Sequence, residues 1–201
     1  SAYFNDGGQG VFCTVLEFDN VEVINKIIAE EKCLYINQIW FGWRRPNTVT
    51  RAEHGLYDSL KTSVKMKTIT TRVKTPEALL EPGTLLKPSY FKTGAFVDVK
   101  SVIKGKGFQG VIKRWNFTMQ PKSHGNTKTV RHRGAFGGNT EPARVFPGTK
   151  MAGRYGFKNS VGYNLEVLEA DDELGLLVVK GSVPGEKGGF ITLRDAIKVY
   201  K

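Results

Sequence analysis

Residues 100–160 read KSVIKGKGFQGVIKRWNFTMQPKSHGNTKTVRHRGAFGGNTEPARVFPGTKMAGRYGFKNS, and this stretch decides how the 201-residue chain is organised. It holds thirteen Lys and Arg against one acid, Glu141, for a net charge of +12. The whole chain carries +11, so the residues outside the stretch are together close to neutral. We call residues 100–160 the basic segment. Charge concentrated in one internal segment indicates that a polyanionic partner binds there.

The basic segment also contains ten glycines and seven aromatic residues. Its repelling charges and its glycines make it unable to fold alone, while its aromatic residues distinguish it from a purely solvating linker. Lys and Arg neutralise phosphates, aromatic rings stack on bases, and glycines let backbone N–H groups approach phosphate oxygens. This combination favours structured RNA as the partner. A solvated basic loop without a ligand is the weaker alternative, and a membrane surface is weaker still because the glycines disfavour a long amphipathic helix.

One motif within the segment points to a different ligand. Gly105–Gly110 matches G-x-G-x-x-G and follows an expected strand over residues 96–103. A dinucleotide site also needs a helix that begins in the motif and an acid about 20 residues further on. No Asp or Glu lies between Val99 and Thr140, and neither an H-R-D nor a D-F-G triplet occurs. We therefore expect no nucleotide cofactor.

Four sequence blocks carry a family resemblance: KGKGFQG (104–110), VIKRWNF (111–117), SHGN (123–126) and VFPGTKMAG (145–153). Together they closely resemble the large-subunit ribosomal protein L-three family, in its bacterial and organellar branch. A weaker match extends from about Phe4 to the C-terminus. The resemblance implies a structural constituent of the large ribosomal subunit that binds ribosomal RNA and supports subunit assembly and the peptidyl-transferase region. A free-standing RNA-binding or RNA-chaperone module is the alternative.

Outside the basic segment, short apolar runs separated by turn residues predict a mainly β fold. We expect strands over residues 11–18, 21–28, 33–41, 64–73, 96–103, 161–170, 175–180 and 190–200. A helix is expected over residues 51–60, where Thr50 and Glu53 have the spacing of a capping box. Seven or eight short strands at regular spacing favour a closed β-barrel, which would leave no sheet edges. The resemblance likewise implies a small barrel of the translation-factor type with a long, irregular, basic internal extension.

The predicted domains follow from these assignments. The barrel is expected to combine residues 1–103 with residues 160–201 and so to be discontinuous, while residues 104–159 form the RNA-penetrating extension. At 22.3 kDa the chain has enough residues for one core and this extension.

The expected RNA-binding residues belong to several chemical kinds. The Lys and Arg side chains are expected to contact phosphates. Trp115, Phe117 and His124 are expected to pack on bases, on sugars or against neighbouring residues of the extension. The asparagines are expected to form hydrogen bonds with RNA edges. For Trp115, burial at the root of the extension is as good an interpretation as base stacking. The expected set is Lys104, Lys106, Lys113, Arg114, Trp115, Asn116, His124, Asn126, Arg131, His132, Arg133, Asn139, Thr140, Arg144, Lys150 and Arg154.

The resemblance gives residues 137–141 a further role as the tip of the extension near the peptidyl-transferase region. Many bacterial relatives carry a methylated glutamine in this loop. Thr140 stands at that position here, which implies that the modification is absent. Glu141 could offset local repulsion, contact Arg144 or approach a base donor. Outside the segment, Arg44, Arg45, Arg51 and Lys61 either extend the RNA footprint or are solvated.

Other functional classes lack sequence support. No nucleophile elbow, paired carboxylates or metal-ligand spacing is present, so we expect no enzyme, no catalytic or metal site, and no cofactor except Mg²⁺ that belongs to the ribosomal RNA. The cluster Asp171–Glu173 is expected to be a solvated turn. Cys13 and Cys33 lie in apolar runs, which favours buried thiols over a disulfide.

The expected partners are large-subunit ribosomal RNA and neighbouring ribosomal proteins, without a membrane or a small-molecule substrate. No run of 18 apolar residues occurs. The chain begins at Ser1, and we expect any targeting peptide to lie outside this sequence. The bacterial type of the blocks, combined with the irregular stretch QIWFGWRR (38–45), favours a mitochondrial ribosome over a bacterial or chloroplast one.

Overall fold

The computed structural model describes residues 2–4, 8–29 and 34–198. The strands are β1 (Ala2–Phe4), β2 (Gly10–Glu17), β3 (Glu22–Ala29), β4 (Leu34–Phe41), β5 (Lys67–Val73), β6 (Phe96–Val102), β7 (Phe108–Gln109), β8 (Gly153–Arg154), β9 (Asn159–Asp171), β10 (Leu176–Lys180) and β11 (Ile191–Asp195). The helices are α1 (Arg51–Ser59) and α2 (Val111–Trp115), with single 3-10 turns η2 (Pro46–Thr48), η3 (Pro76–Ala78) and η4 (Pro88–Tyr90). The mainly β class is confirmed.

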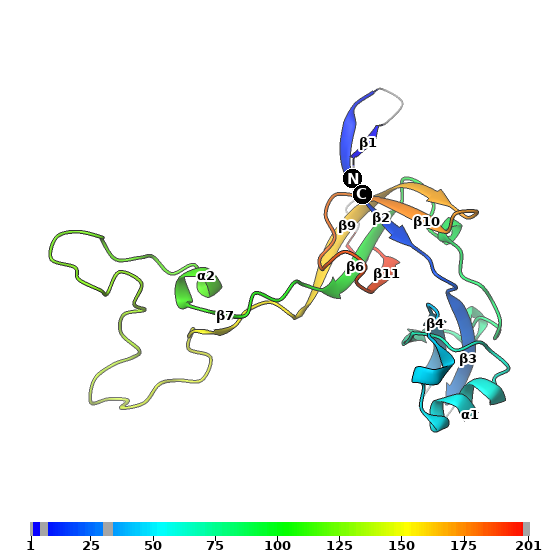
Figure 1. Ribbon diagram of the computed structural model, residues 1–201, viewed down its shortest axis with the longest axis horizontal. Coiled ribbons are helices and arrows are strands. Elements are labelled where there is room, and N and C mark those ends of the chain that lie inside the picture. Colours follow the sequence, from blue (N-terminus) through cyan, green and yellow to red (C-terminus); the bar gives the residue numbers. More distant parts are fainter. Residues whose placement is uncertain (1, 5–7, 30–33, 199–201) are drawn as a thin grey trace. The chain divides into compact units, whose positions relative to one another are not determined.

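The strands form three sheets (Figure 1). The largest has six strands in the order β1-β2-β10-β9-β6-β11, the second has the order β3-β4-β5, and β7 pairs with β8 alone. In the largest sheet β10 pairs antiparallel with both β2 and β9. Val97, Val167, Leu177 and Val179 are fully buried there, because the apolar positions of their strands recur on one face.

The three-stranded sheet has its own small core. Trp40 of β4 and Tyr57 of α1 meet edge to face, with ring centroids 4.9 Å apart, and Ile24 of β3 joins them. The Tyr57 hydroxyl donates to the Lys65 carbonyl at 3.1 Å, and the buried Lys65 ammonium lies 3.2 Å from Glu22. These polar partners satisfy groups that would otherwise be costly to bury.

Helix α1 begins as the sequence predicts. The Thr50 hydroxyl accepts from the Glu53 backbone N–H at 3.4 Å, and the Glu53 carboxylate accepts from the Thr50 N–H at 3.1 Å. This reciprocal capping box satisfies two backbone donors that the first helical turn leaves free. The predicted helix over residues 51–60 is therefore confirmed to within one residue.

Most expected strands are present, with shifted ends. Strand β5 begins three residues later than expected, and β11 covers only five residues of the run 190–200, whose last two residues lie outside the described chain. Cys33, at the start of the third expected strand, also lies outside it, while Cys13 is buried. The sequence did not predict β1, β7, β8, α2, η2 or η4, which have two to five residues each.

The predicted closed barrel is wrong for the part of the chain that the structure describes. The six-stranded sheet is open and ends at β1 on one edge and β11 on the other. Three strands expected in the barrel wall, β3, β4 and β5, pair with one another in a separate sheet. Alternating apolar residues predict that a strand exists, but they do not determine its partners, because many pairings bury the same face.

By contacts between residues the chain divides into two compact units. One contains residues 1–98, 163–183 and 193–201, and the other contains residues 99–162 and 184–192. The second unit includes the whole basic segment. The assignment of residues 104–159 as an RNA-penetrating extension remains a prediction.

Candidate nucleic-acid interface

The two ends of the basic segment run side by side as an antiparallel ribbon. The Lys106 N–H donates to the Tyr155 carbonyl at 2.8 Å, and the Tyr155 N–H donates to the Gly107 carbonyl at 2.9 Å. Beyond them β7 pairs with β8, with Phe108 opposite Arg154. Three predicted site residues, Lys104, Lys106 and Arg154, therefore lie on one short ribbon although they come from opposite ends of the segment.

Helix α2 brings Arg114 and Trp115 to the same acceptor at the end of this ribbon. The Arg114 Nη1 donates to the Met151 carbonyl at 2.7 Å, and the Trp115 Nε1 donates to it at 2.9 Å. The Arg114 guanidinium lies 5.0 Å and the Lys150 ammonium 5.7 Å from the Trp115 ring centroid. Trp115 is thus anchored to the backbone yet 38% exposed, and its stacking on a base remains a prediction.

Asn126 organises a second turn of the segment. Its Nδ2 donates to the Pro121 carbonyl at 2.6 Å and to the Gln120 Oε1 at 3.3 Å, and its Oδ1 accepts from the Thr129 hydroxyl. The side-chain amide of Asn126 is therefore already hydrogen-bonded within the chain. Its expected contact with RNA edges would have to use the remaining hydrogen-bonding capacity of the amide oxygen. His124 lies two residues before it, exposed and with φ of 62°.

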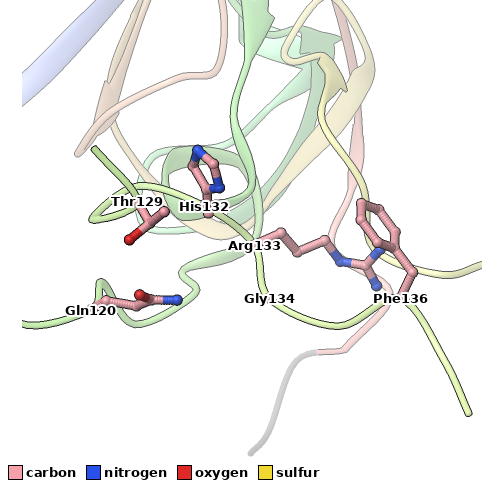
Figure 2. Close-up of a pocket in the computed structure, with 6 residues that line it drawn as sticks. All are labelled: Gln120, Thr129, His132, Arg133, Gly134 and Phe136. Carbon is pink, nitrogen blue, oxygen red and sulfur yellow. The ribbon is translucent and has the colours of Figure 1, made fainter. Parts of the chain in front are cut away.

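Two further cations lie over aromatic rings. The Arg133 guanidinium is 4.3 Å from the centroid of Phe136, and the Arg144 guanidinium is 5.1 Å from that of Phe146. Nε and Nη1 of Arg133 are buried, and they have no hydrogen-bond acceptor in the described chain. Arg133 also lines a cavity with Gln120, Thr129, His132, Gly134 and Phe136 (Figure 2).

The remaining predicted residues are not brought into one cluster. Lys113, Asn116, Asn139 and Thr140 are exposed in separate stretches of the segment, and Glu141 forms no ion pair with Arg144 in the described chain. Of the sixteen predicted site residues, only Arg114, Asn126 and Arg133 are half-buried and the rest are exposed. Such a surface is accessible to a large partner along its length.

The charge of the basic segment is not compensated by acids of the described chain. The ion pairs there are Lys26–Glu81, Lys65–Glu22, Lys180–Glu166 and Arg194–Asp98, and none includes a cation of the segment. Unpaired cations at this density repel one another, so an external polyanion lowers their electrostatic free energy.

Two glycines stand at positions where a side chain would collide with a neighbouring part of the segment. A Cβ on Gly156 would lie 2.2 Å from the Lys104 carbonyl oxygen, and one on Gly153 would lie 2.6 Å from the Arg114 Nη1. Sequence reasoning counted these glycines as a source of flexibility and did not recognise that they permit close contact. The lining residues Gln120 and Thr129 were also missed, and no motif distinguishes them in the sequence.

The remaining sequence expectations have local structural outcomes. Helix α2 does begin directly after the motif Gly105–Gly110, but it has only five residues, and the acid that a dinucleotide site needs is absent from the sequence that follows. Asp171 accepts from the Glu173 and Leu174 N–H groups, so it forms part of the turn between β9 and β10.

The cations expected near α1 differ in their surroundings. Arg44 is half-buried and donates to the Thr48 hydroxyl and carbonyl, at 3.0 and 2.7 Å, which gives it a local structural role. Arg45, Arg51 and Lys61 are exposed, so both interpretations stay open for them.

Two other kinds of site are absent from the described residues. No three His, Cys, Asp or Glu side chains of that part of the chain gather in a way that could hold a metal ion. Likewise, none of its helices has the length and apolar character needed to cross a membrane.

Comparisons with known proteins agree with the blocks that the sequence singled out. The family model described as Ribosomal protein L3 matches residues 47–174, which include the whole basic segment. A relative from Schizosaccharomyces pombe (strain 972 / ATCC 24843), named "Large ribosomal subunit protein uL3m", is 39% identical over 197 residues. That alignment covers 98% of this chain and 76% of the relative.

Proposed function

The chain belongs to the ribosomal protein L3 family, and from this premise we propose that its basic segment binds large-subunit ribosomal RNA and supports assembly of the subunit. The protein is a structural constituent of the large ribosomal subunit, and its similarity to a uL3m protein places it in the mitochondrion. Neighbouring ribosomal proteins are its other partners. Its role is structural, without catalytic residues or a cofactor of its own.

One observation carries the proposal: the cations of the basic segment lack acidic partners in the described chain, while each ion pair found there uses a Lys or Arg from outside the segment. Phosphates supply the missing negative charge, and the counterions that they release favour binding. The exposed rings of Phe108, Phe136, Phe146 and Phe157 offer flat faces for bases. The favourable contacts offset the entropy cost of ordering the glycine-rich segment.

The paired ends of the segment give this binding a fixed base. The ribbon of residues 103–109 and 153–158 holds Lys104, Lys106 and Arg154 near one another. Beyond it, residues 137–141 form the exposed turn that the family resemblance assigns to the peptidyl-transferase region. We assign this turn a role in shaping the RNA there, without any part in the chemical step.

A free-standing RNA-binding or RNA-chaperone protein is the competing function. The two are separated by sedimentation through a sucrose gradient at high salt. A structural constituent stays with the large subunit, whereas a peripheral binder is released into the upper fractions. Release of the chain under conditions in which other core proteins of the subunit stay bound would contradict the proposal.

Salt dependence tests which cations reach phosphates. Lys106 is an exposed cation of the segment. If it contacts a phosphate, Lys106→Gln should reduce the magnitude of the slope of log K against log [salt], for binding to large-subunit RNA, by about 0.7–0.9. Lys92→Gln is the matched control, because Lys92 is also exposed but lies outside the segment. Equal slopes for wild type and Lys106→Gln would mean that Lys106 faces solvent in the complex.

A further inference from the structure

A cavity of about 530 Å³ lies within the basic segment (Figure 2). We propose that it holds one unstacked nucleotide of the large-subunit ribosomal RNA, an inference that rests on the RNA binding proposed above. The lining residues are Gln120, Thr129, His132, Arg133, Gly134 and Phe136. All of them belong to residues 120–136 of one compact unit.

Arg133 indicates that the cavity receives a ligand. Its Nε and Nη1 are buried without an acceptor, and among the described Lys and Arg residues that are not exposed no other has side-chain nitrogens in that state. A buried charged donor without a partner is costly, because it has lost its hydration and gained no hydrogen bond in return. A phosphate or base oxygen in the cavity supplies the missing acceptor once the guanidinium turns toward it, and a guanidinium fits such oxygens with parallel hydrogen bonds.

Phe136 indicates that the ligand has a flat face. The residue is 54% exposed, although the Arg133 guanidinium lies only 4.3 Å from the ring centroid. In Figure 2 the Gln120 amide and the Thr129 hydroxyl lie to one side of Arg133, and Phe136 lies to the other. The cavity therefore offers an aromatic face, a cation and polar groups that can bond a base edge, the combination that binds unstacked bases.

The backbone around the cavity is held by hydrogen bonds of the segment itself. The Gln120 N–H donates to the Val130 carbonyl at 3.2 Å, and the His132 N–H donates to the Thr129 carbonyl at 2.9 Å. The side chain of Asn126 links Gln120 to Thr129. These bonds bring residues 120 and 129–132 together before any partner binds, which lowers the entropy cost of forming the pocket.

Size and charge favour a nucleotide over a protein side chain. Pockets for small organic groups have volumes of roughly 300–1,000 Å³, and the observed cavity lies in that range. No acid lines it, while Arg133 and His132 contribute cationic or hydrogen-bonding groups. A neighbouring ribosomal protein that inserts a side chain is the other possible occupant, and the experiment distinguishes the two.

Chemical probing of assembled large subunits tests the proposal. Subunits are isolated from cells in which the full chain carries Phe136→Ala or Arg133→Gln, and their RNA is treated with dimethyl sulfate and with a 2′-hydroxyl acylating reagent. Both substitutions should increase the reactivity of the same single nucleotide, because base–aromatic stacking worth about 1–3 kcal/mol corresponds to roughly a 5- to 150-fold change in the equilibrium between its bound and free states. Sedimentation of the variant chain with the subunit tests the proposed function separately.

Tyr163→Ala is the matched control. Tyr163 of β9 is 59% exposed, close to the 54% of Phe136, but it lies outside the basic segment. This variant should leave the nucleotide unchanged. If Phe136→Ala is not incorporated, Phe136→Leu keeps the apolar bulk and removes only the aromatic face.

Three outcomes would overturn the proposal: unchanged RNA reactivity in the Phe136 and Arg133 variants, the same change in Tyr163→Ala, or cross-linking of residues 129–136 to a neighbouring protein instead of RNA. An ultraviolet-induced adduct between a peptide containing Phe136 and the nucleotide identified by probing would support it.

Discussion

Gly156 is the residue on which the paired ends of the basic segment depend most directly. Its φ is 82°, a conformation that L side chains rarely adopt, and a Cβ there would lie 2.2 Å from the Lys104 carbonyl oxygen. That oxygen belongs to the backbone, so it can move only if the two strands of the ribbon separate. Close approach of two chains, more than flexibility, explains this glycine.

Gly156→Ala should therefore open the ribbon. Left-handed strain alone costs about 1–3 kcal/mol, and the collision adds to it. Amide hydrogen exchange at Lys106 and Tyr155, whose N–H groups bond across the ribbon, should accelerate accordingly. Gly148→Ala is the control, because Gly148 has φ of 81° with open space around its Cβ position. Equal effects of the two substitutions would show that backbone strain acts alone.

Asp172 illustrates a carboxylate whose role is structural. Its oxygens accept from the Ser89 N–H at 2.8 Å and from the Ser89 hydroxyl at 2.7 Å. These bonds favour the charged form and hold the pKa of Asp172 below its ordinary value, with Lys87 adding a smaller effect in the same direction. Because the folded pKa is depressed, the stabilisation is present above the unfolded pKa and disappears as pH falls through the folded one.

Ser89→Ala should raise the pKa of Asp172 toward that of an unperturbed aspartate, since it removes the hydrogen bond that contributes most to the shift. The measurement is a carboxyl-carbon NMR titration of Asp172 in the wild type and in the variant. An unchanged Asp172 titration after removal of the hydroxyl would contradict the assigned cause.

At the level of elements, one buried carboxylate joins three strands of the largest sheet. Asp98 of β6 is fully buried and accepts from the Asn164 N–H of β9 at 3.2 Å and from Nη2 of Arg194, in β11, at 3.1 Å. It also accepts from the Ile197 N–H at 3.4 Å. The short edge strand β11 therefore has a polar attachment in addition to its backbone pairing.

Asp98→Ala should destabilise the protein by about 1–3 kcal/mol, because it leaves the half-buried Asn164 N–H without its acceptor, while the exposed Arg194 can be solvated instead. The measurement is the midpoint of urea unfolding, monitored by fluorescence. Asp195→Ala is the control, because Asp195 is exposed at the end of β11, and it should change the free energy of unfolding by no more than about 0.5 kcal/mol. Similar midpoints for the two variants would mean that the Asp98 contacts add little.

The same elements show what local sequence can and cannot predict. Apolar alternation correctly predicted strands such as β2 and β10, and the capping box correctly predicted α1, because both patterns depend on neighbouring residues. The closed barrel failed because strand partners are chosen by the whole chain. Helix α2 escaped prediction because five residues beside glycines show no periodicity. In the candidate site, charge was evident in the sequence, but the shared Met151 acceptor and the cavity beside Arg133 depend on residues that only folding brings together.

At the level of the whole molecule, the net positive charge and most of the buried apolar side chains lie in different parts of the chain. Residues outside the basic segment are close to neutral and contain most of the buried apolar side chains. The segment carries the positive charge and is largely exposed. A protein divided in this way can fold its sheets on apolar burial while the charge of the segment is reserved for RNA.

Deleting residues 117–150 should therefore leave the sheets folded and impair assembly of the large subunit. The ends of the deletion already lie close together, because the Trp115 Nε1 bonds the Met151 carbonyl at 2.9 Å, so a short Gly-Ser linker can join Asn116 to Met151. Circular dichroism and urea unfolding measure the first expectation, and the amount of large subunit in sucrose gradients measures the second.

The control keeps the length of the segment and replaces its six Lys and Arg between residues 117 and 150 with Gln. If charge carries the function, this variant should assemble as poorly as the deletion. Normal assembly with the deletion would contradict the assigned role of the segment. Normal assembly with the Gln variant but not with the deletion would mean that the segment acts through its shape and not through phosphate binding.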